Sequence, residues 1–185
     1  MRVRRQISLA LLCAATSLLG CEDAPPAEVD PCADPAALPY IEGAHVSAQA
    51  AVAEMAGACS SSQSIFVHGE DLTELRLPHM QWVAKDIEVG WCRPRDRGCV
   101  GNPRLSVVEA PRLKRIRSLT IGKPGAPNPA LTTVSFPQLE EISEHLVIQA
   151  EALEGIEFPA LKRVGGRIEI ARCVSEGPSC VAMNR

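Results

Sequence analysis

The chain has 185 residues, of which 46% are hydrophobic, 3% are aromatic and eight are cysteines. Its 19 Lys and Arg residues are outnumbered by 22 Asp and Glu residues, which gives a formal net charge of −3. This balance argues against a nucleic-acid-binding protein and against electrostatic adhesion to anionic lipid.

Residues 1–20 are typical of a lipoprotein signal peptide. Three arginines lie within the first five residues, and the apolar run that follows, Ile7–Leu19, is too short to span a bilayer as a stable helix. The run leads into Leu18-Leu19-Gly20-Cys21, which resembles the bacterial lipobox. The resemblance implies that Cys21 is diacylated and becomes the mature N-terminus. Ordinary cleavage that leaves a free Cys21 is the alternative.

Residues 21–39 are predicted to be a lipidated tether, because a segment so rich in proline, alanine and acidic residues cannot form a core. Loss of the signal peptide would leave 16 basic and 22 acidic residues, a net charge of −6. Membrane attachment would therefore be through the acyl chains on Cys21. We expect a lipid-anchored protein of the cell envelope, in the outer membrane rather than the inner one, and the membrane face stays open.

Residues 40–185 are the third predicted unit, which begins with a helix. The segment SAQAAVAEMAG consists mostly of good helix formers, with Ser47 as the expected N-cap and Gly57 as the expected end. After it, Ile65 and Val67 match the strand positions of the repeats that follow, which indicates a partial copy. A helix here would cover the open end of a stack of repeats.

Residues 72–170 contain an internal repeat. The pattern L-x-x-[LVI]-x-[LAF]-P-x-[LM]-x-x-[IV], followed by a [LI]-x-[IV] segment, occurs four times. The copies begin at Leu72, Leu105, Leu131 and Leu153. Their aligned prolines are Pro78, Pro111, Pro137 and Pro159, with spacings of 33, 26 and 22 residues. Such self-similarity predicts a repeat architecture before any single residue is considered.

The apolar residues of each copy fall into columns. The final positions alternate with polar residues, as in Arg167-Ile168-Glu169-Ile170, and a period of two with β-branched residues indicates a strand with one buried face. The proline has no N–H to donate, so it belongs at a strand end. One coil is therefore a strand, a proline corner, an apolar turn, a second strand and a variable loop.

A coil of this size cannot bury its own apolar face, so stacked copies would stabilise one another as nearest neighbours. We predict a mainly β protein, a β-helix-like or leucine-rich-repeat-like solenoid of about five coils with one N-terminal capping helix. A β-sandwich with similar strand spacing is the alternative, but a sandwich has no reason to repeat the proline register.

Six cysteines remain once Cys13 and Cys21 are set aside, and an even number in an exported chain favours disulfides. Two local pairs follow the same strand position with the same spacing, Cys92–Cys99 and Cys173–Cys180. Elimination leaves Cys32–Cys59, which would hold the tether against the helix. A metal site is the alternative, but the four histidines follow no ligand spacing. We therefore predict no metal and no cofactor.

The unit L-T-x-V-x-F-P-x-L-x-x-I-x-x-x-L-x-I, preceded by a helix and a short I-x-V strand, resembles the receptor L-domain. That family forms the ligand-binding lobes of insulin-type and EGF-type receptors, and related repeats occur in bacterial surface lipoproteins. The resemblance covers about residues 40–180. It implies a right-handed solenoid and a binding role, but no functional residue can be carried over, because the shared residues are the core columns.

The outward positions of the second strands are the default ligand face. They are Phe66, Glu88, Thr120, Val147 and Glu169, beside His68, Gly90, Gly122, Gln149 and Ala171. This face is expected to have no aromatic ladder for sugars. Glu88 and Glu169 would lie three coils apart, roughly 14 Å at ~4.8 Å per coil, which is too far for a catalytic carboxylate pair. No nucleophile, zinc or phosphate-loop motif occurs, so we expect no enzyme.

One loop suggests a contact site. Arg93, Arg95 and Arg97 lie between Cys92 and Cys99, next to Trp91 and with Trp82 in the same copy. Arginine suits bidentate carboxylate recognition, and interfaces favour Trp and Arg. We hypothesise that the loop contacts an acidic partner; a solvated loop that only closes a coil is the alternative.

The sequence thus favours a non-enzymatic binding module of the envelope that recognises a protein or a surface polymer. A purely structural envelope lipoprotein and a β-helix enzyme acting on polysaccharide are the alternatives. The ligand and the oligomeric state cannot be predicted.

Overall fold

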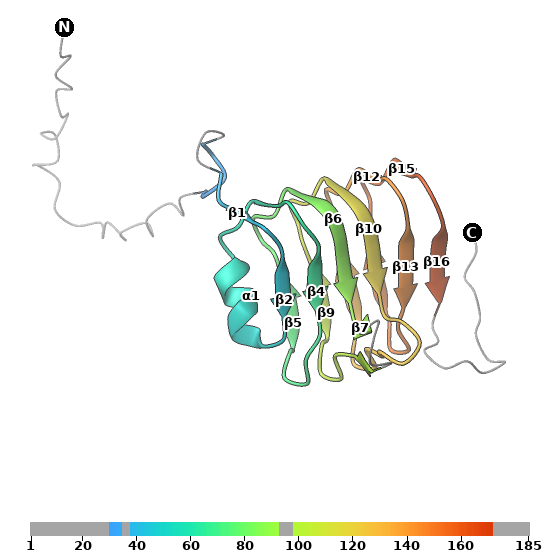
Figure 1. The fold of residues 1–185 in the computed structure, drawn as a ribbon. Coiled ribbons are helices and arrows are strands. Elements are labelled where there is room, and N and C mark those ends of the chain that lie inside the picture. The colour runs from blue at the N-terminus through green and yellow to red at the C-terminus, as the bar shows by residue number, and fades with distance from the viewer. Residues whose placement is uncertain (1–29, 35–37, 93–97, 172–185) are drawn as a thin grey trace, which may run out of the picture.

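The computed structural model describes residues 30–34, 38–92 and 98–171. This part of the protein is mainly β, with sixteen short strands and one helix, as predicted. Except in one small hairpin, paired strands are parallel, and they lie side by side along one axis of the molecule (Figure 1). Within the described residues, no helix has the length and apolar character needed to cross a membrane.

The first strands of the four copies form a four-stranded parallel sheet. In order they are β5 (Glu74–Arg76), β9 (Val107–Glu109), β11 (Thr133–Ser135) and β14 (Gly155–Glu157).

The second strands belong to a ten-stranded sheet, in which β12 and β13, and likewise β15 and β16, are two short pieces of one copy. The members from the repeats are β6 (Trp82–Val89), β10 (Arg115–Ile121), β12 (Glu141–Ile142), β13 (Leu146–Gln149), β15 (Arg163–Val164) and β16 (Ile168–Ala171). The members before the repeats are β1 (Tyr40–Ile41), β2 (Ala44–Val46), β3 (Ser60–Ser61) and β4 (Ile65–Val67). The third sheet is an antiparallel hairpin of β7 (Trp91–Cys92) and β8 (Cys99–Val100).

The register of both large sheets follows the predicted apolar columns. In the four-stranded sheet, Leu75 pairs with Val108, then Val134, then Ile156. In the ten-stranded sheet one column runs Ile87, Leu119, Leu146, Ile168, and the next runs Val89, Ile121, Ile148, Ile170. All four aligned prolines lie in turns that follow the first strands. The copies are therefore piled in the register that the repeat predicts.

The second copy has one residue fewer between its two second-strand columns. Three residues lie between Val83 and Ile87, but two lie between Ile116 and Leu119, and the pairing of β6 with β10 shifts between Ile116 and Ser118. A one-residue difference in a strand pair is accommodated by such an irregularity, which keeps the apolar side chains on the inner face.

The N-terminal end of the stack contains more strand than predicted. β2 pairs with β4, and β1 pairs with β3, so two further parallel layers precede the first full copy. The helix α1 (Gln49–Met55) is present, and it buries Val52 and Met55. Its N-cap is Ala48 with no side-chain cap, so the predicted capping by Ser47 is wrong. Instead, the Gln49 side chain bonds the Thr73 N–H and the Glu74 backbone, which fixes the helix to β5.

Two buried asparagines link successive loops inside the stack. Asn102 and Asn128 are fully buried, and Asn102 Nδ2 donates to Asn128 Oδ1 (2.8 Å) and to the Val67 carbonyl (3.2 Å). Asn128 Nδ2 donates in turn to the Val89 carbonyl. Buried amides need such partners, and here they join three consecutive layers.

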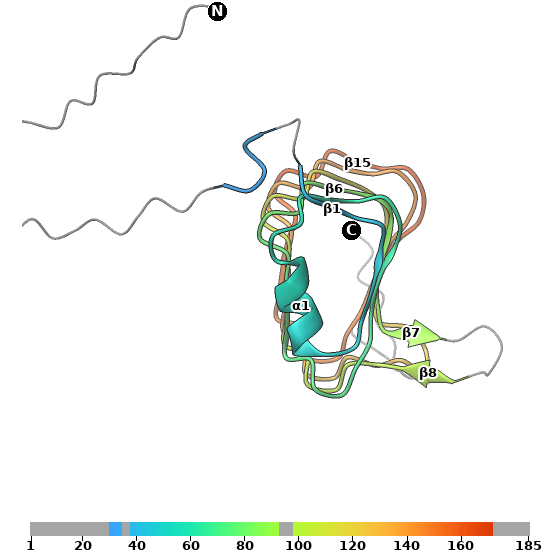
Figure 2. The same ribbon diagram turned by 60° about the vertical axis from the view of Figure 1, so that its left-hand side comes forward.

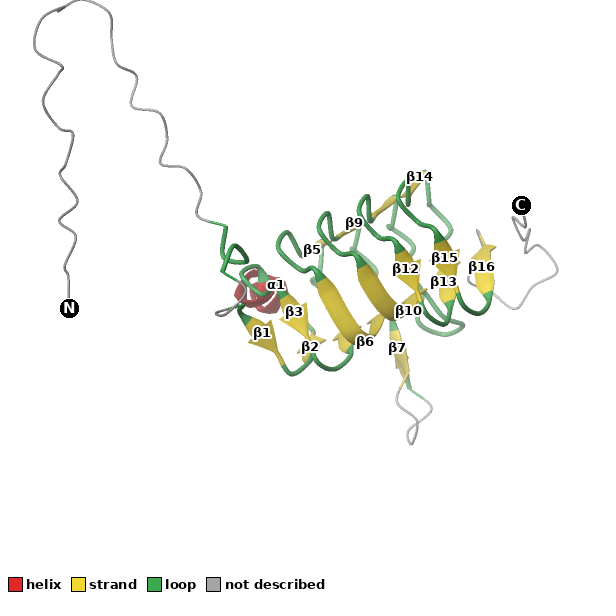
Figure 3. Ribbon diagram, turned by 90° about the horizontal axis from the view of Figure 1, so that it is seen from above, coloured by secondary structure: helices red, strands yellow, loops and turns green. Residues whose placement is uncertain are grey.

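The C-terminal copy is less buried than the copies before it. Leu146 is 2% exposed, whereas Ile168, the next residue of its column, is 55% exposed. Phe158, Leu161 and Ile170 are likewise only partly buried. Within the described residues, the helix covers one end of the stack and nothing equivalent covers the other (Figure 3).

Two of the three predicted disulfides are present. Cys32 bonds Cys59, four residues after α1, and Cys92 bonds Cys99 across the β7–β8 hairpin. The third predicted pair, Cys173–Cys180, lies outside the described residues, as do Cys21 and the signal peptide.

Candidate functional site

The outward residues of the ten-stranded sheet form the row expected from sequence. Phe66 pairs with Glu88, then Thr120, Val147 and Glu169, and Gln149 pairs with Ala171. The row also has a member at its N-terminal end that was not predicted, since His45 in β2 pairs with Phe66.

Four rings gather at that end of the row, and we call them the aromatic patch: His45, Phe66, His68 and Trp91. His45 stacks on Phe66, with ring centres 4.9 Å apart, and His68 stacks on Trp91 at 5.1 Å. The two stacks meet edge-on, because the His45 ring lies 5.4 Å from Trp91 and 5.9 Å from His68. His45 is exposed and the other three are half-buried. The sequence did not predict this cluster, which lies at one end of the face and does not continue along it as a ladder.

Local backbone geometry brings Trp91 to the patch. Gly90 ends the long strand β6 with a φ of +91°, a conformation that residues with a side chain rarely adopt. A Cβ at Gly90 would also lie 2.7 Å from the Ala126 carbonyl oxygen. The chain therefore turns out of the sheet at this point into the β7–β8 hairpin, which projects from the lower corner of the stack (Figure 2).

A shallow hollow of about 390 Å³ borders the patch. His45 and Phe66 line it together with polar side chains of the preceding turns and of β6, including Glu42, Gln63 and Lys85. A partner that contacts the rings would thus meet donors, acceptors and both charge signs at the edge of the patch.

The carboxylates of the outward row are already engaged. Glu88 accepts a hydrogen bond from Lys123 Nζ, and Glu169 accepts one from Gln149 Nε2 (2.6 Å) and pairs with Arg167 (3.1 Å). Their register separation is three strand steps, roughly 14 Å. This arrangement does not suit a pair of cooperating catalytic carboxylates, which lie closer together.

A second cluster joins the start of the described chain to the repeats. Asp30 forms a bidentate pair with Arg112 (2.6 and 2.7 Å) and lies near His79. The hydrogen bonds from Arg112 and from the Cys32 N–H lower the pKa of Asp30 from 3.8 to about 2. Asp30, Cys32 and His79 are close enough to share a metal ion. However, the Cys32 sulfur is in a disulfide and the Asp30 carboxylate holds Arg112, so the donor set does not fit one.

The structure separates the residues of the predicted contact loop. Trp91 belongs to the aromatic patch, whereas Trp82 lies at the start of β6, in a row with Ser60 and Arg115, and lines a different hollow. Arg93, Arg95 and Arg97 lie outside the described residues. Aligning Ala44-His45-Val46 with Ile65-Phe66-Val67, which have the same alternation, would have placed His45 beside Phe66, but it does not bring Trp91 to them.

In comparisons with known proteins, no family model, no curated protein and no solved structure matches the chain.

Proposed function

We propose that the stacked copies are a right-handed, β-helix-like solenoid of about five coils, similar to a receptor L-domain, with α1 as its N-terminal cap. The support is the shared register of the apolar columns that lie in strands and the placement of the aligned prolines in equivalent turns. A β-sandwich would instead pair its strands mainly in antiparallel order.

We propose further that the protein is a lipoprotein of the cell envelope. In this proposal residues 1–20 are the signal peptide, residues 21–39 the tether with lipid on Cys21, and residues 40–185 the displayed module. The disulfide Cys32–Cys59 and the Asp30–Arg112 ion pair support a tether that is attached to the module at two points. Force applied to the lipid anchor would therefore be transmitted to the repeats.

The lipid anchor has a direct test. Mass spectrometry of the N-terminal peptide from membranes should give Cys21 with its acyl chains, and Cys21→Ser should move the protein to the aqueous phase on detergent phase separation. A native protein that begins at another residue, or an unacylated Cys21 in the membrane fraction, would contradict this part of the proposal.

The function that the geometry supports best is non-enzymatic binding of another envelope component, a protein or a surface polymer. The aromatic patch carries this proposal. In a chain with six Phe, Tyr and Trp residues in total, two lie in one partly exposed cluster with two histidines. Rigid rings of this kind dominate the energy of many interfaces, because they bury a large area at low entropic cost.

The two alternatives make different use of this surface. A purely structural lipoprotein has no need of a partly exposed cluster of rings beside a disulfide-bonded hairpin. An enzyme acting on polysaccharide would need cooperating acid and base groups, whereas the carboxylates of the outward row are far apart and paired with neighbouring side chains.

A capture experiment tests the binding proposal. Immobilised wild-type protein is compared with the double variant Phe66→Ala, Trp91→Ala on solubilised envelope fractions, with Thr120→Ala, which lies in the same row outside the patch, as the control. We expect wild type and the control to retain one component selectively and the double variant to lose it. Equal retention by all three proteins would remove the patch from the proposal.

A further inference from the structure

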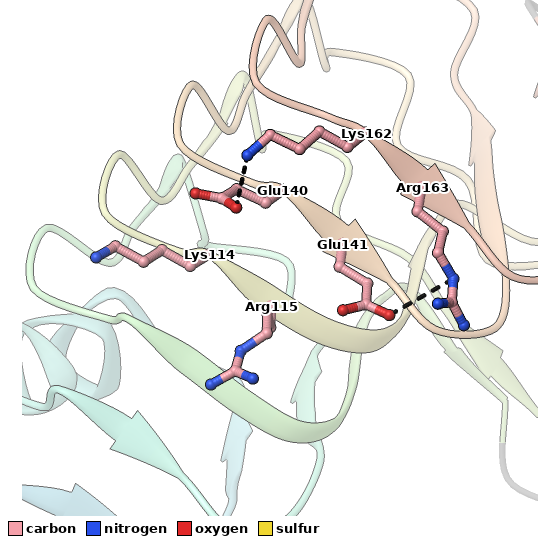
Figure 4. Close-up of a pocket in the computed structure, with 6 residues that line it drawn as sticks. All are labelled: Lys114, Arg115, Glu140, Glu141, Lys162 and Arg163. Atoms are coloured by element: carbon pink, nitrogen blue, oxygen red, sulfur yellow. Dashed lines mark hydrogen bonds and ion pairs between the residues drawn. The ribbon is translucent and has the colours of Figure 1, made fainter.

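A second set of charged side chains lies where the last three copies enter their second strands, and we call it the charged corner: Lys114, Arg115, Glu140, Glu141, Lys162 and Arg163 (Figure 4). Each of the last three copies contributes two adjacent residues of one sign. Arg115 pairs in register with Glu141, and Glu141 with Arg163, so the signs alternate from copy to copy. Neighbouring positions are one strand step apart, ~4.8 Å.

Two of the four basic residues at the charged corner are not used in its ion pairs. Lys162 donates to Glu140 (2.9 Å), and Arg163 pairs with Glu141 (3.6 Å). Among the described residues, Lys114 and Arg115 form no ion pair, although both are exposed. The corner holds four basic and two acidic residues, a local charge of +2 on a chain whose formal net charge is −3.

The basic residues at the corner hold Glu140 in its ionised form. The pKa of Glu140 is lowered, first by the hydrogen bond from Lys162 and then by the charges of Lys162, Lys114 and Arg115. The positive charges of Lys114 and Arg115 thus stabilise the ionised Glu140 carboxylate, although that carboxylate is hydrogen-bonded to Lys162 and not to them.

An exposed indole lies beside Arg115, one of these two cations. Trp82 pairs in register with Arg115 and is 38% exposed. The charged corner lines a hollow of about 390 Å³, and a second hollow of about 260 Å³, lined by Trp82 and Arg117, shares Arg115 and Glu141 with it. The two hollows therefore adjoin at these two shared residues, and together we call them the groove.

We propose that this groove binds an acidic polysaccharide, with the carboxylate of one hexuronate unit held by Arg115, its ring against Trp82, and Lys114 as the contact for a carboxylate further along the polymer. One hexuronate unit combines the two features that the groove offers side by side, a carboxylate and a ring face rich in C–H groups. Arginine and lysine recognise the carboxylate by charge-assisted hydrogen bonds, and the flat indole accepts the ring. The regular step between copies suits an extended polymer with repeating units.

This proposal goes beyond the binding function assigned to the aromatic patch, and it uses different residues. Trp91→Ala should leave uronate binding unchanged, and Trp82→Ala should leave the capture through the patch unchanged. Failure of one proposal is therefore distinguishable from failure of the other.

The test is calorimetric titration of the full-length protein with tetragalacturonate, at low and at physiological salt. We expect measurable binding that weakens as salt rises. The double variant Lys114→Ser, Arg115→Ser should weaken it by about tenfold or more, the effect of losing a charge-assisted contact. Arg104→Ser removes an exposed arginine that pairs with Asp71 away from the groove, and it should bind like wild type.

Specificity is tested with two further probes, neutral maltotetraose and tetraglutamate. Both should bind at least tenfold more weakly than tetragalacturonate, and Trp82→Phe should retain binding that Trp82→Ala loses. No binding of tetragalacturonate, equal binding of maltotetraose, or equal binding of the acidic peptide would each overturn the proposal. Circular dichroism of each variant, expected to match wild type, confirms that a loss of binding is local.

Discussion

At the scale of single residues, the buried amide of Asn128 joins two loops of the stack. Replacing it with alanine leaves the fully buried Asn102 side chain without its 2.8 Å partner. We expect Asn128→Ala to lower the free energy of unfolding by about 1–3 kcal/mol, the usual cost of an orphaned buried polar group. Urea denaturation measures this, with exposed Gln138→Ala as the control. A shift in midpoint no larger than that of the control would contradict the role of the pair.

The Asp30–Arg112 pair should give the protein a stability contribution that depends on pH. Because the folded-state pKa of Asp30 is about 2 and its ordinary value is 3.8, the contribution is fully present above about pH 4 and is lost as the pH falls through 2. Wild type should therefore melt above Asp30→Asn at neutral pH, and the difference should vanish near pH 2. Asp71→Asn is the matched control, since its pair with Arg104 is highly exposed. A difference that is constant from pH 7 to 2 would contradict this account.

At the scale of the elements, close approach between copies depends on a glycine. Gly122 follows β10 with a φ of +78°, and a Cβ there would lie 2.0 Å from the Gln149 carbonyl oxygen of the next copy. Gly122→Ala should destabilise the fold by about 1–3 kcal/mol, because it combines backbone strain with a backbone clash.

Gly155 is the control for this prediction, because a Cβ added there meets no atom within 4 Å. Gly155→Ala should change the unfolding midpoint little. Equal unfolding midpoints for the two variants would contradict the prediction, because they would show that the turn after β10 accommodates a Cβ at Gly122 without loss of stability.

The strands that sequence could predict are those with a repeated apolar alternation, such as β10 and β13, where burial on one face determines the register. β1 and β3 have only two residues each, and the two residues of β3, Ser60 and Ser61, are polar yet buried. Neither strand therefore has an alternation of apolar and polar residues from which it could be predicted. The helix was predictable from its composition, but its N-cap was not, because Ser47 lies outside it and Gln49 contacts β5 instead.

The candidate site, too, could be predicted from the sequence only where it follows the repeated alternation of the strands. The outward row followed from the period of the strands, and Trp91 followed from its position beside a cysteine. The patch itself depends on the pairing of β2, which contains His45 and precedes α1 in the chain, with β4, which follows α1. It also depends on the turn at Gly90, which brings Trp91 to the other rings. Contacts between a partial copy and a hairpin are tertiary, so the repeat pattern does not encode them.

At the scale of the whole molecule, the free energy of burial should depend on position in the stack. Phe136 and Phe158 are equivalent residues of adjacent copies, stacked at 5.6 Å, but Phe136 is 1% exposed and Phe158 is only partly buried. Phe136→Ala should cost about 3–5 kcal/mol, the range for a buried aromatic residue, and Phe158→Ala clearly less. Chemical denaturation of the two variants measures the difference, and equal costs would contradict stabilisation by neighbouring copies.

Our principal proposal is that an anchored stack of repeats presents its aromatic patch to another component of the envelope. Site-specific photocrosslinking in intact cells tests it most directly, with a benzophenone side chain at the exposed position of His45 or, for comparison, at Gln138 in the turn after β11. The account predicts a discrete adduct from position 45 that is lost with Trp91→Ala, and none from position 138. The same adducts from both positions, or none from position 45, would contradict it.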